Sequence, residues 1–220
     1  MFYSFIGYYA LVLGLIVSFP IFFFSIKNLK NNEALDIKII SFSFIQLLLV
    51  FTSFLGLVIS FVFSDFSNET VFNNSHTTKP LFYKISGTWG NHEGSLLLWL
   101  LVLTLFIFIF LIKTKNLLKN YRILTTLFQQ IIIFGFFIFL INSSNPFNHI
   151  YPAPIEGLGL NPILQDPALA IHPPILYLGY VGSSIIFSSV LAAASLSYIS
   201  KTWATHIKSW ILISWIFLTL

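Results

Sequence analysis

The 220-residue sequence contains no cysteine, so the chain can neither exchange thiols nor hold an iron–sulfur cluster by itself. Charged residues are also scarce, because they make up 8% of the chain while 57% of its residues are hydrophobic. An ordinary soluble domain carries roughly 25% charged residues. These two shortages exclude a thiol-based redox enzyme and indicate a membrane protein.

Five apolar stretches are long enough to cross a bilayer, whose hydrocarbon core takes about 20 helical residues. They lie at about residues 4–24, 40–63, 95–112, 123–141 and 175–199. A sixth begins near Ser209 and, with only about a dozen residues before Leu220, is too short to cross unaided. The first stretch lacks a basic leader and a cleavage site, so we expect a retained helix. The sequence predicts an all-α integral membrane protein: a single membrane domain, 1–220, with five full spans and a partial sixth.

Lysine and arginine are distributed unevenly between the loops. Nine of the eleven lie in the first, third and fifth loops, namely Lys27, Lys30, Lys38, Lys113, Lys115, Lys119, Arg122, Lys201 and Lys208. Five of the seven acids lie in the loops at 64–94 and 142–174, namely Asp65, Glu69, Glu93, Glu156 and Asp166. Because basic loops stay on the cytoplasm-like side, we expect loops 64–94 and 142–174 and the N-terminus to face outward.

The same distribution bears on partners and on location. The net charge of +4 reflects topology and offers no support for nucleic-acid binding. No span has a charged residue in its interior, which disfavours a transporter or channel. Abundant phenylalanine (26 residues) with a single methionine is typical of an AT-rich, organellar gene. We therefore expect the mitochondrial inner membrane, with a bacterial plasma membrane as the alternative.

Prolines are concentrated in loop 142–174, which includes part of the stretch "LQDPALAIHPPILYLGYVG". Asp166 followed by Pro167 is typical of an N-cap with proline at the first helical position, and predicts a short turn that Pro173 closes. The residue before a proline prefers extended geometry, so His172 is expected outside helical conformation. Pro173 and Pro174 are then expected to start the fifth membrane helix.

Two roles remain open for His172 on this reasoning. A low dielectric and a helix N-terminus both favour the neutral imidazole, which is the form that a metal or haem iron binds. The amides of that helix N-terminus would suit an anion such as a haem propionate. A hydrogen-bonded histidine at the membrane interface is the alternative, and spacing alone does not identify a ligand.

The other outward loop ends in "SGTWGNHEGSLLLW", where Asn91 or Ser95 is expected to cap the third span. Trp89 is typical of an interfacial aromatic belt. His92 and Glu93 are adjacent and so do not share a helical face as paired catalytic groups would. Glu93 suits the first turn of a helix better than a general base, and no catalytic residue is predicted.

The two outward loops together resemble the CcmF family, the haem lyase membrane subunits of the cytochrome c maturation system. The resemblance is carried by "TWGNHEGSLLLW", "SNPF", "PIEG", "LNPILQDPALAIHPPILYLGYVG" and "WIFLTL", in family order across most of the chain. It implies that the chain holds haem b, received from a haem chaperone, for attachment to apocytochrome c on the outward face. It also implies that His172 is an axial ligand of the haem iron, between the rigid neighbours Pro173 and Pro174.

The resemblance implies further residues and partners. Asn161, Gln165, Asp166 and Tyr177 are candidates to orient His172 or to contact propionates, although each is equally a turn or cap residue, Asp166 above all. Trp89 is a candidate to shield the porphyrin, and His92 and Glu93 are candidates of open role. The sulfur would come from the apocytochrome, with thiol-handling maturation subunits as partners.

The chain also departs from the family pattern, because the tryptophan-rich WWD segment and the histidines that follow it are absent. His76 and His149 are expected to be solvated loop residues, and His206 lies on the inward side. We therefore expect the N-terminal part of a split or truncated haem lyase, inactive without a companion chain that supplies the WWD segment and a second axial ligand. The alternative is a structural subunit of a larger inner-membrane assembly that does not handle haem.

Overall fold

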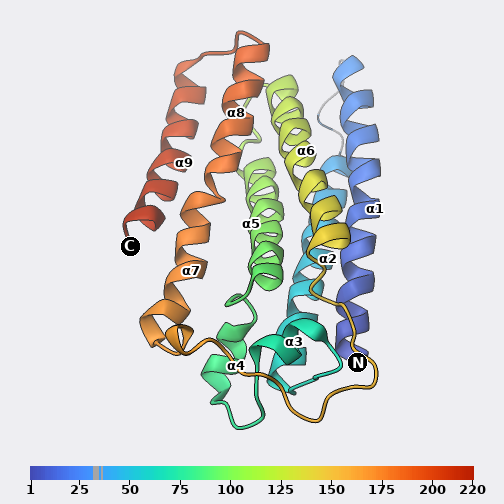
Figure 1. Ribbon diagram of the computed structural model, residues 1–220. Helices are drawn as coiled ribbons and strands as arrows, with labels where there is room; N and C mark the ends of the chain where they lie inside the picture. The colour runs from blue at the N-terminus through green and yellow to red at the C-terminus, as the bar shows by residue number, and fades with distance from the viewer. Residues whose placement is uncertain (32–34, 36) are drawn as a thin grey trace. The chain divides into compact units, whose positions relative to one another are not determined.

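The computed structural model describes residues 1–31, 35 and 37–220, and the regular secondary structure in these residues is helical (Figure 1). In chain order the helices are α1 (Phe2–Lys30), α2 (Ile37–Val62), α3 (Glu69–Asn74), α4 (Leu81–Gly87), α5 (His92–Lys113), α6 (Lys119–Ser143), the short 3₁₀ helix η1 (Pro162–Leu164), α7 (Pro167–Tyr180), α8 (Ser183–Ser195) and α9 (Lys201–Thr219). The predicted all-α class is confirmed.

Five helical stretches are long and apolar enough to cross a membrane, as predicted: α1, α2, α5, α6 and the run Pro167–Ser195 that α7 and α8 form together. The helices extend beyond the apolar runs that predicted them. For example, α1 continues to Lys30, with Lys27 and Lys30 in its last turn. Cations there interact favourably with the carbonyl end of the helix dipole, so the polar ends can stay helical.

The predicted start of the fifth span at residue 175 is wrong, and so is the short turn before it. The helix α7 begins at Pro167 and continues without a break through Pro173 and Pro174. Loop 142–174 therefore ends at Asp166. The interruption comes later, at Val181 and Gly182 between α7 and α8.

The predicted start of the last helix near Ser209 is also wrong. Helix α9 has 19 residues and begins at Lys201, so Lys201, His206 and Lys208 lie on a helix rather than in a loop. The side chain of Ser200 caps it, because its Oγ accepts a hydrogen bond from the backbone N of Trp203 at 3.1 Å. The helix begins eight residues before the apolar run that starts near Ser209, which is why hydropathy placed the start too late.

The described chain divides into two compact units. Unit 1 comprises Met1–Leu13, Leu49–Leu101 and Phe136–Pro174, and unit 2 comprises Gly14–Leu48, Val102–Gly135 and Ile175–Leu220. Unit 1 contains both loops that were predicted to face outward. The first of these loops, 64–94, is partly helical, because it includes α3, α4 and the start of α5. Figure 1 shows the segment between α6 and α7 running past α3 and α4.

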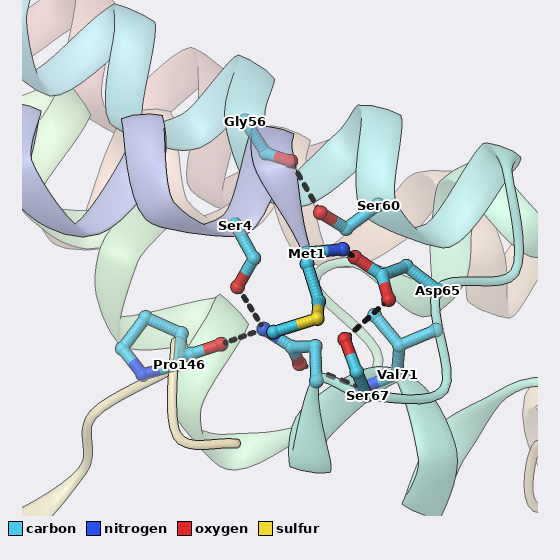
Figure 2. Close-up of polar contacts among 9 residues, drawn as sticks. Met1, Ser4, Gly56, Ser60, Asp65, Ser67, Val71 and Pro146 are labelled. Atoms are coloured by element: carbon cyan, nitrogen blue, oxygen red, sulfur yellow. Dashed lines mark hydrogen bonds and ion pairs between the residues drawn. The ribbon is translucent and has the colours of Figure 1, made fainter. Parts of the chain in front are cut away.

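Asn68 joins three segments in unit 1. Its buried side chain donates hydrogen bonds to Ser4 Oγ and to the carbonyl oxygen of Pro146, both at 2.9 Å, and its Oδ1 accepts from the backbone N of Val71 at 3.0 Å. The last bond caps α3. Nearby, the Asp65 carboxylate contacts the amino group of Met1 (Figure 2). The Asn68 side chain thus ties α1, α3 and the segment after α6 together.

Close packing of α1 on α2 in unit 1 depends on glycine. A Cβ atom at Gly56 would lie 2.8 Å from the carbonyl oxygen of Tyr3 and 3.0 Å from the Cα of Gly7. Helices pack this closely in membranes where small residues meet, since dispersion contacts replace the hydrophobic effect. A side chain at Gly56 would push the two helices apart, whereas one at Gly7 would meet the ring of Phe147.

Buried polar side chains join the helices of unit 2. Gln46 on α2 donates to Ser18 Oγ on α1 at 2.9 Å and accepts from Gln130 Nε2 on α6 at 2.8 Å. The neighbouring Gln129 accepts a hydrogen bond from Ser188 on α8 at 2.8 Å. Hydrogen bonds between helices stabilise membrane bundles by up to about 2 kcal/mol each.

Arg122 was predicted in the third loop but lies in the first turn of α6, where it is 6% exposed. Its Nη2 donates to the carbonyl oxygen of Leu111 at 2.6 Å, and its Nε donates to Thr114 Oγ1 at 3.2 Å. The carbonyl of Leu111 belongs to the last turn of α5, which lacks partners within its own helix. The guanidinium therefore closes the end of α5.

We predict that Asn68→Ala lowers the free energy of unfolding by about 2–3 kcal/mol, because it leaves buried backbone groups of Val71 and Pro146 without these partners. Thermal unfolding in detergent, followed by circular dichroism, measures the change. The control is Asn73→Ala, which changes an exposed asparagine on α3, the helix that Asn68 caps. Equal loss in the two variants would contradict the role assigned to Asn68.

Candidate functional site

His172 is the sixth residue of α7, which begins at Pro167, and its side chain is exposed. The expectation that it lies outside helical conformation is wrong. Within the described part of the chain it makes no hydrogen bond or ion pair. An exposed imidazole without a partner is free to bind a ligand.

Helix α7 continues through Pro173 and Pro174 because the Trp89 side chain replaces a backbone N–H donor that Pro174 lacks. Pro174 has no N–H, so it cannot bond the carbonyl of Ala170 four residues earlier. That carbonyl instead accepts a hydrogen bond from Trp89 Nε1 at 2.8 Å. The steric preference of a residue before proline is thus outweighed at His172 by a continuous helix that Trp89 supports. Trp89 had been considered only as a belt or porphyrin-shielding residue.

The start of α7 is fixed by caps. Asp166 Oδ1 accepts from the backbone N of Ala168 at 2.8 Å and from that of Leu169 at 3.0 Å, which confirms the predicted N-cap. Asn161 Oδ1 likewise accepts from Ile163 N at 3.1 Å and caps η1. These bonds hold the stretch that leads into His172.

The remaining neighbours of His172 in sequence differ in their surroundings. Gln165 Nε2 donates to the carbonyl oxygen of Leu160 at 3.1 Å. Tyr177 also lies on α7, but it belongs to unit 2, whereas His172 belongs to unit 1. Roles for Asn161, Gln165 and Tyr177 in orienting the imidazole or contacting propionates stay predictions.

The turn from α4 to α5 requires glycine and is closed by a cap. A Cβ atom at Gly94 would lie 1.7 Å from the carbonyl oxygen of Thr88, so no other residue fits. Asn91 Oδ1 accepts from Gly94 N at 2.7 Å, which confirms Asn91 as the cap of α5. Glu93 lies in the first turn of α5, as predicted. This turn carries Trp89 toward α7.

His92 is exposed at the first position of α5. Its Nδ1 lies 3.1 Å from Ser144 Oγ, just after α6, and its ring meets that of Phe139 edge-on, with the centroids 6.5 Å apart. The described residues contain no group of three or more His, Asp or Glu arranged to hold a metal. His92 is therefore positioned by the end of α6, and its function stays open.

A carboxylate joins the two loops of unit 1. Glu156 accepts hydrogen bonds from the hydroxyl of Thr77 and, at 2.9 Å, from the backbone N of Thr77. The Thr77 hydroxyl above all, with the N–H groups of Thr77 and Gly157 and the nearby His76, lowers the pKa of Glu156 from 4.5 to about 2, against a smaller effect of desolvation. His76 Nε2 lies 3.8 Å from this carboxylate, and its side chain is 40% exposed.

His149 is not the solvated loop residue that the sequence predicted. Its ring lies nearly parallel to those of Phe5 and Tyr151, with centroids 4.6 and 6.2 Å away. Burial first, and the positive N-terminal amino group second, lower the pKa of His149. This ring therefore packs the loop against α1, and we assign it no ligand.

Sequence reasoning missed two contacts that position the site. A signal for the Trp89–Ala170 bond was present, because a helical Pro174 leaves the carbonyl of Ala170 without a donor and an indole is a donor only. The contact between Glu156 and Thr77 has no such signal, since 79 residues separate the pair.

Comparison with known proteins gives one family and several long relatives. Residues 89–220 match the family described as cytochrome C assembly protein. The cytochrome c-type biogenesis protein CycK of Bradyrhizobium diazoefficiens is 46% identical over 215 residues, which are 97% of this chain and 33% of that protein. The cytochrome c-type biogenesis protein CcmF of Escherichia coli is 40% identical over 180 residues, or 81% of this chain and 28% of that protein.

A solved structure is also similar. The protein named Cytochrome c Heme Lyase CcmF matches 99% of this chain and 34% of its own chain, with a TM-score of 0.83 and 26% sequence identity. The chain thus spans about a third of the length of the relatives it matches, from their N-terminal part.

We predict that Trp89→Phe destabilises the fold by about 1–3 kcal/mol, because it leaves the carbonyl of Ala170 without a donor. Pro174→Ala restores an N–H to this carbonyl, so Trp89→Phe should cost less in that background. A double-mutant cycle on thermal unfolding measures the coupling, which we expect to reach about 1 kcal/mol.

Pro173→Ala is the matched control, because it restores an N–H to the carbonyl of Leu169 instead. No coupling with Trp89→Phe is expected there. Additive effects in the Pro174→Ala background, or equal coupling in both, would show that Trp89 does not compensate for Pro174.

We also predict pH-dependent order in the loop that contains Glu156. Since the pKa of Glu156 is lower in the folded state than its usual 4.5, its contact with Thr77 stabilises the fold above that pH and is lost as the pH falls toward 2. Hydrogen exchange of peptides covering residues 75–79 and 154–158 should rise on acidification. Glu156→Gln should show fast exchange already at pH 7, and the exposed Glu69→Gln should not; similar profiles for both would contradict the assignment.

Proposed function

Because the chain belongs to the cytochrome c assembly protein family, we propose that it forms the N-terminal part of a haem lyase and holds haem for transfer to apocytochrome c. The observation that carries the proposal is the exposed, unpartnered imidazole of His172 on a helix whose start is fixed by Asp166 and Trp89. The likeness to a protein named as a haem lyase, over 99% of this chain, supports it.

The donor chemistry of the site fits haem iron. A neutral imidazole is a common ligand of haem iron, and a rigid backbone keeps the imidazole of a histidine in one position. Pro173 and Pro174 fix φ on one side of His172, and the caps of α7 fix the other. His172 would therefore be the residue of this chain that holds the haem iron, and Trp89, which contacts α7 at Ala170, would cover part of the porphyrin.

Sequence beyond this chain would complete the site. The chain spans about a third of its relatives, and its described residues hold no metal-binding cluster. We propose that the second axial ligand and the tryptophan-rich segment come from elsewhere, either from a longer polypeptide or from a companion chain. When bound, haem supplies the vinyl groups to which the apocytochrome's thiols are joined. Haem chaperone and thiol-handling subunits are the partners that this reaction needs.

We further propose that loops 64–94 and 142–166 face outward, together with the N-terminus. Only two of the eleven lysine and arginine residues of the chain lie in these loops, which supports this orientation by the positive-inside rule. Lys79 is one of only two basic residues there, and burial, together with the charge of Lys84, lowers its pKa to about 8. A lysine with this pKa is still mostly protonated at pH 7, so Lys79 and Lys84 both count as cations in these loops.

The compartment stays a prediction within the class of integral membrane proteins. The relatives named above are bacterial, which favours a plasma membrane. The amino-acid composition had favoured the mitochondrial inner membrane instead.

The proposal predicts that His172→Ala lowers the haem content of the purified assembly at least about tenfold. Loss of a residue that only supports a metal ligand already lowers metal affinity by at least about tenfold, so loss of the ligand itself should cost no less. Pyridine haemochrome spectra measure the content, and added imidazole should restore part of it. His206→Ala, which removes an imidazole from α9, is the control. Unchanged haem in a folded His172→Ala assembly would overturn the proposal and favour a structural subunit.

A further inference from the structure

Unit 2 contains a pocket that the proposed haem function does not use. Its volume is about 450 Å³, within the range of roughly 300–1,000 Å³ that is typical of ligand sites. Helices α5, α7 and α9 line it with Phe106, Ile109, Lys113, Leu178, His206, Ser209, Trp210, Ile213 and Phe217. All of these residues belong to unit 2.

Most of the pocket wall is apolar, and its residues on α5 and α7 belong to membrane-spanning stretches. The rings of Phe106 and Trp210 lie 5.5 Å apart, centroid to centroid, and join α5 to α9. Ile213 is 41% exposed, so the wall is not closed off on its side. A ligand with a hydrocarbon chain therefore suits this wall.

The polar end of the pocket is basic. Lys113 is the last residue of α5, and His206 is the sixth residue of α9. Within the described residues, neither side chain has a hydrogen bond or an ion pair. Lys115 and Lys208 lie close to them in the sequence and do not line the pocket. Two unpaired basic groups at the mouth of an apolar pocket suit a ligand with an anionic head.

The depth of the pocket matches half a bilayer. Phe217 follows His206 by eleven residues on α9, which is roughly 16 Å at a helical rise of 1.5 Å per residue. The hydrocarbon core is about 30 Å thick, so this distance is about one leaflet. An amphiphile that lies along α9 would have its head at the membrane boundary and its chain end near the midplane.

We propose that this pocket binds an anionic phospholipid, with an acyl chain against Phe106, Ile213 and Phe217 and the phosphate near Lys113 and His206. Clusters of basic residues at a membrane boundary attract anionic headgroups, by about a fivefold factor in affinity for each lysine or arginine. A zwitterionic lipid has the same chains and no net charge. The headgroup charge therefore provides the selectivity, and the pocket provides the location.

The test uses the full chain with its native membrane partners in phosphatidylcholine vesicles. One sample receives phosphatidylglycerol with a diazirine at the end of one acyl chain, and another receives phosphatidylcholine with the same label. After irradiation, labelled peptides are mapped by mass spectrometry. We expect the phosphatidylglycerol probe to label peptides with Phe106, Ile213 or Phe217 at least about fivefold more than the phosphatidylcholine probe.

Matched variants separate a site from general charge. Lys113→Gln combined with His206→Gln should reduce this labelling at least about fivefold, whereas Lys115→Gln combined with Lys208→Gln, which removes two nearby cations, should change it less than about twofold. Ile213→Trp, which fills the pocket, should also reduce it, and thermal unfolding confirms that each variant is folded. Equal labelling by the two probes, or an equal loss in both double variants, would overturn the proposal.

Two further results would also overturn it. Even labelling of all the membrane-spanning helices would mean that the probe reaches the protein only from the surrounding bulk lipid. Absence of pocket labelling, with crosslinks from a photoreactive residue at position 213 to a partner polypeptide, would mean that protein covers the pocket.

Discussion

The hydrogen bond from the Trp89 indole to the carbonyl of Ala170 is the contact on which the candidate site depends. A helix with two successive prolines loses two donors, and in an apolar setting an unpaired carbonyl costs several kcal/mol. Trp89 supplies one donor from outside the helix. As a result, α7 stays helical through His172 and presents its imidazole from a rigid element, which is a more exact support than a loop provides.

The contacts around this bond explain why the long segment after α6 is ordered. Asn68 holds it at Pro146, and Glu156 holds it at Thr77. Asp166 then starts α7. Each contact provides a hydrogen-bond partner for backbone groups, which a segment without strands or long helices would otherwise leave unpaired. Asn68, Glu156 and Asp166 thus serve structure first, whereas the exposed His172 on α7 has no hydrogen bond or ion pair among the described residues.

Much of the fold could be predicted from the sequence, because a bilayer demands long apolar helices and hydropathy detects them. The caps at Asn91 and Asp166 were also predictable, since capping is local. The wrong predictions rested on local preferences that contacts with residues distant in the sequence outweighed. The extended preference before Pro173 was outweighed by Trp89, and the solvation expected of His149 was outweighed by packing on Phe5. For the site, the sequence identified His172 but not the residues that hold its helix in place.

The central claim is that a continuous α7 presents His172 to haem. The most direct test is a cryo-electron microscopy map of this chain with its native partners, prepared with haem. The account predicts helical density from Pro167 through Pro174, the Trp89 indole against Ala170, and porphyrin density at the His172 imidazole. Porphyrin density ligated by other residues, with His172 turned into protein contacts, would contradict it.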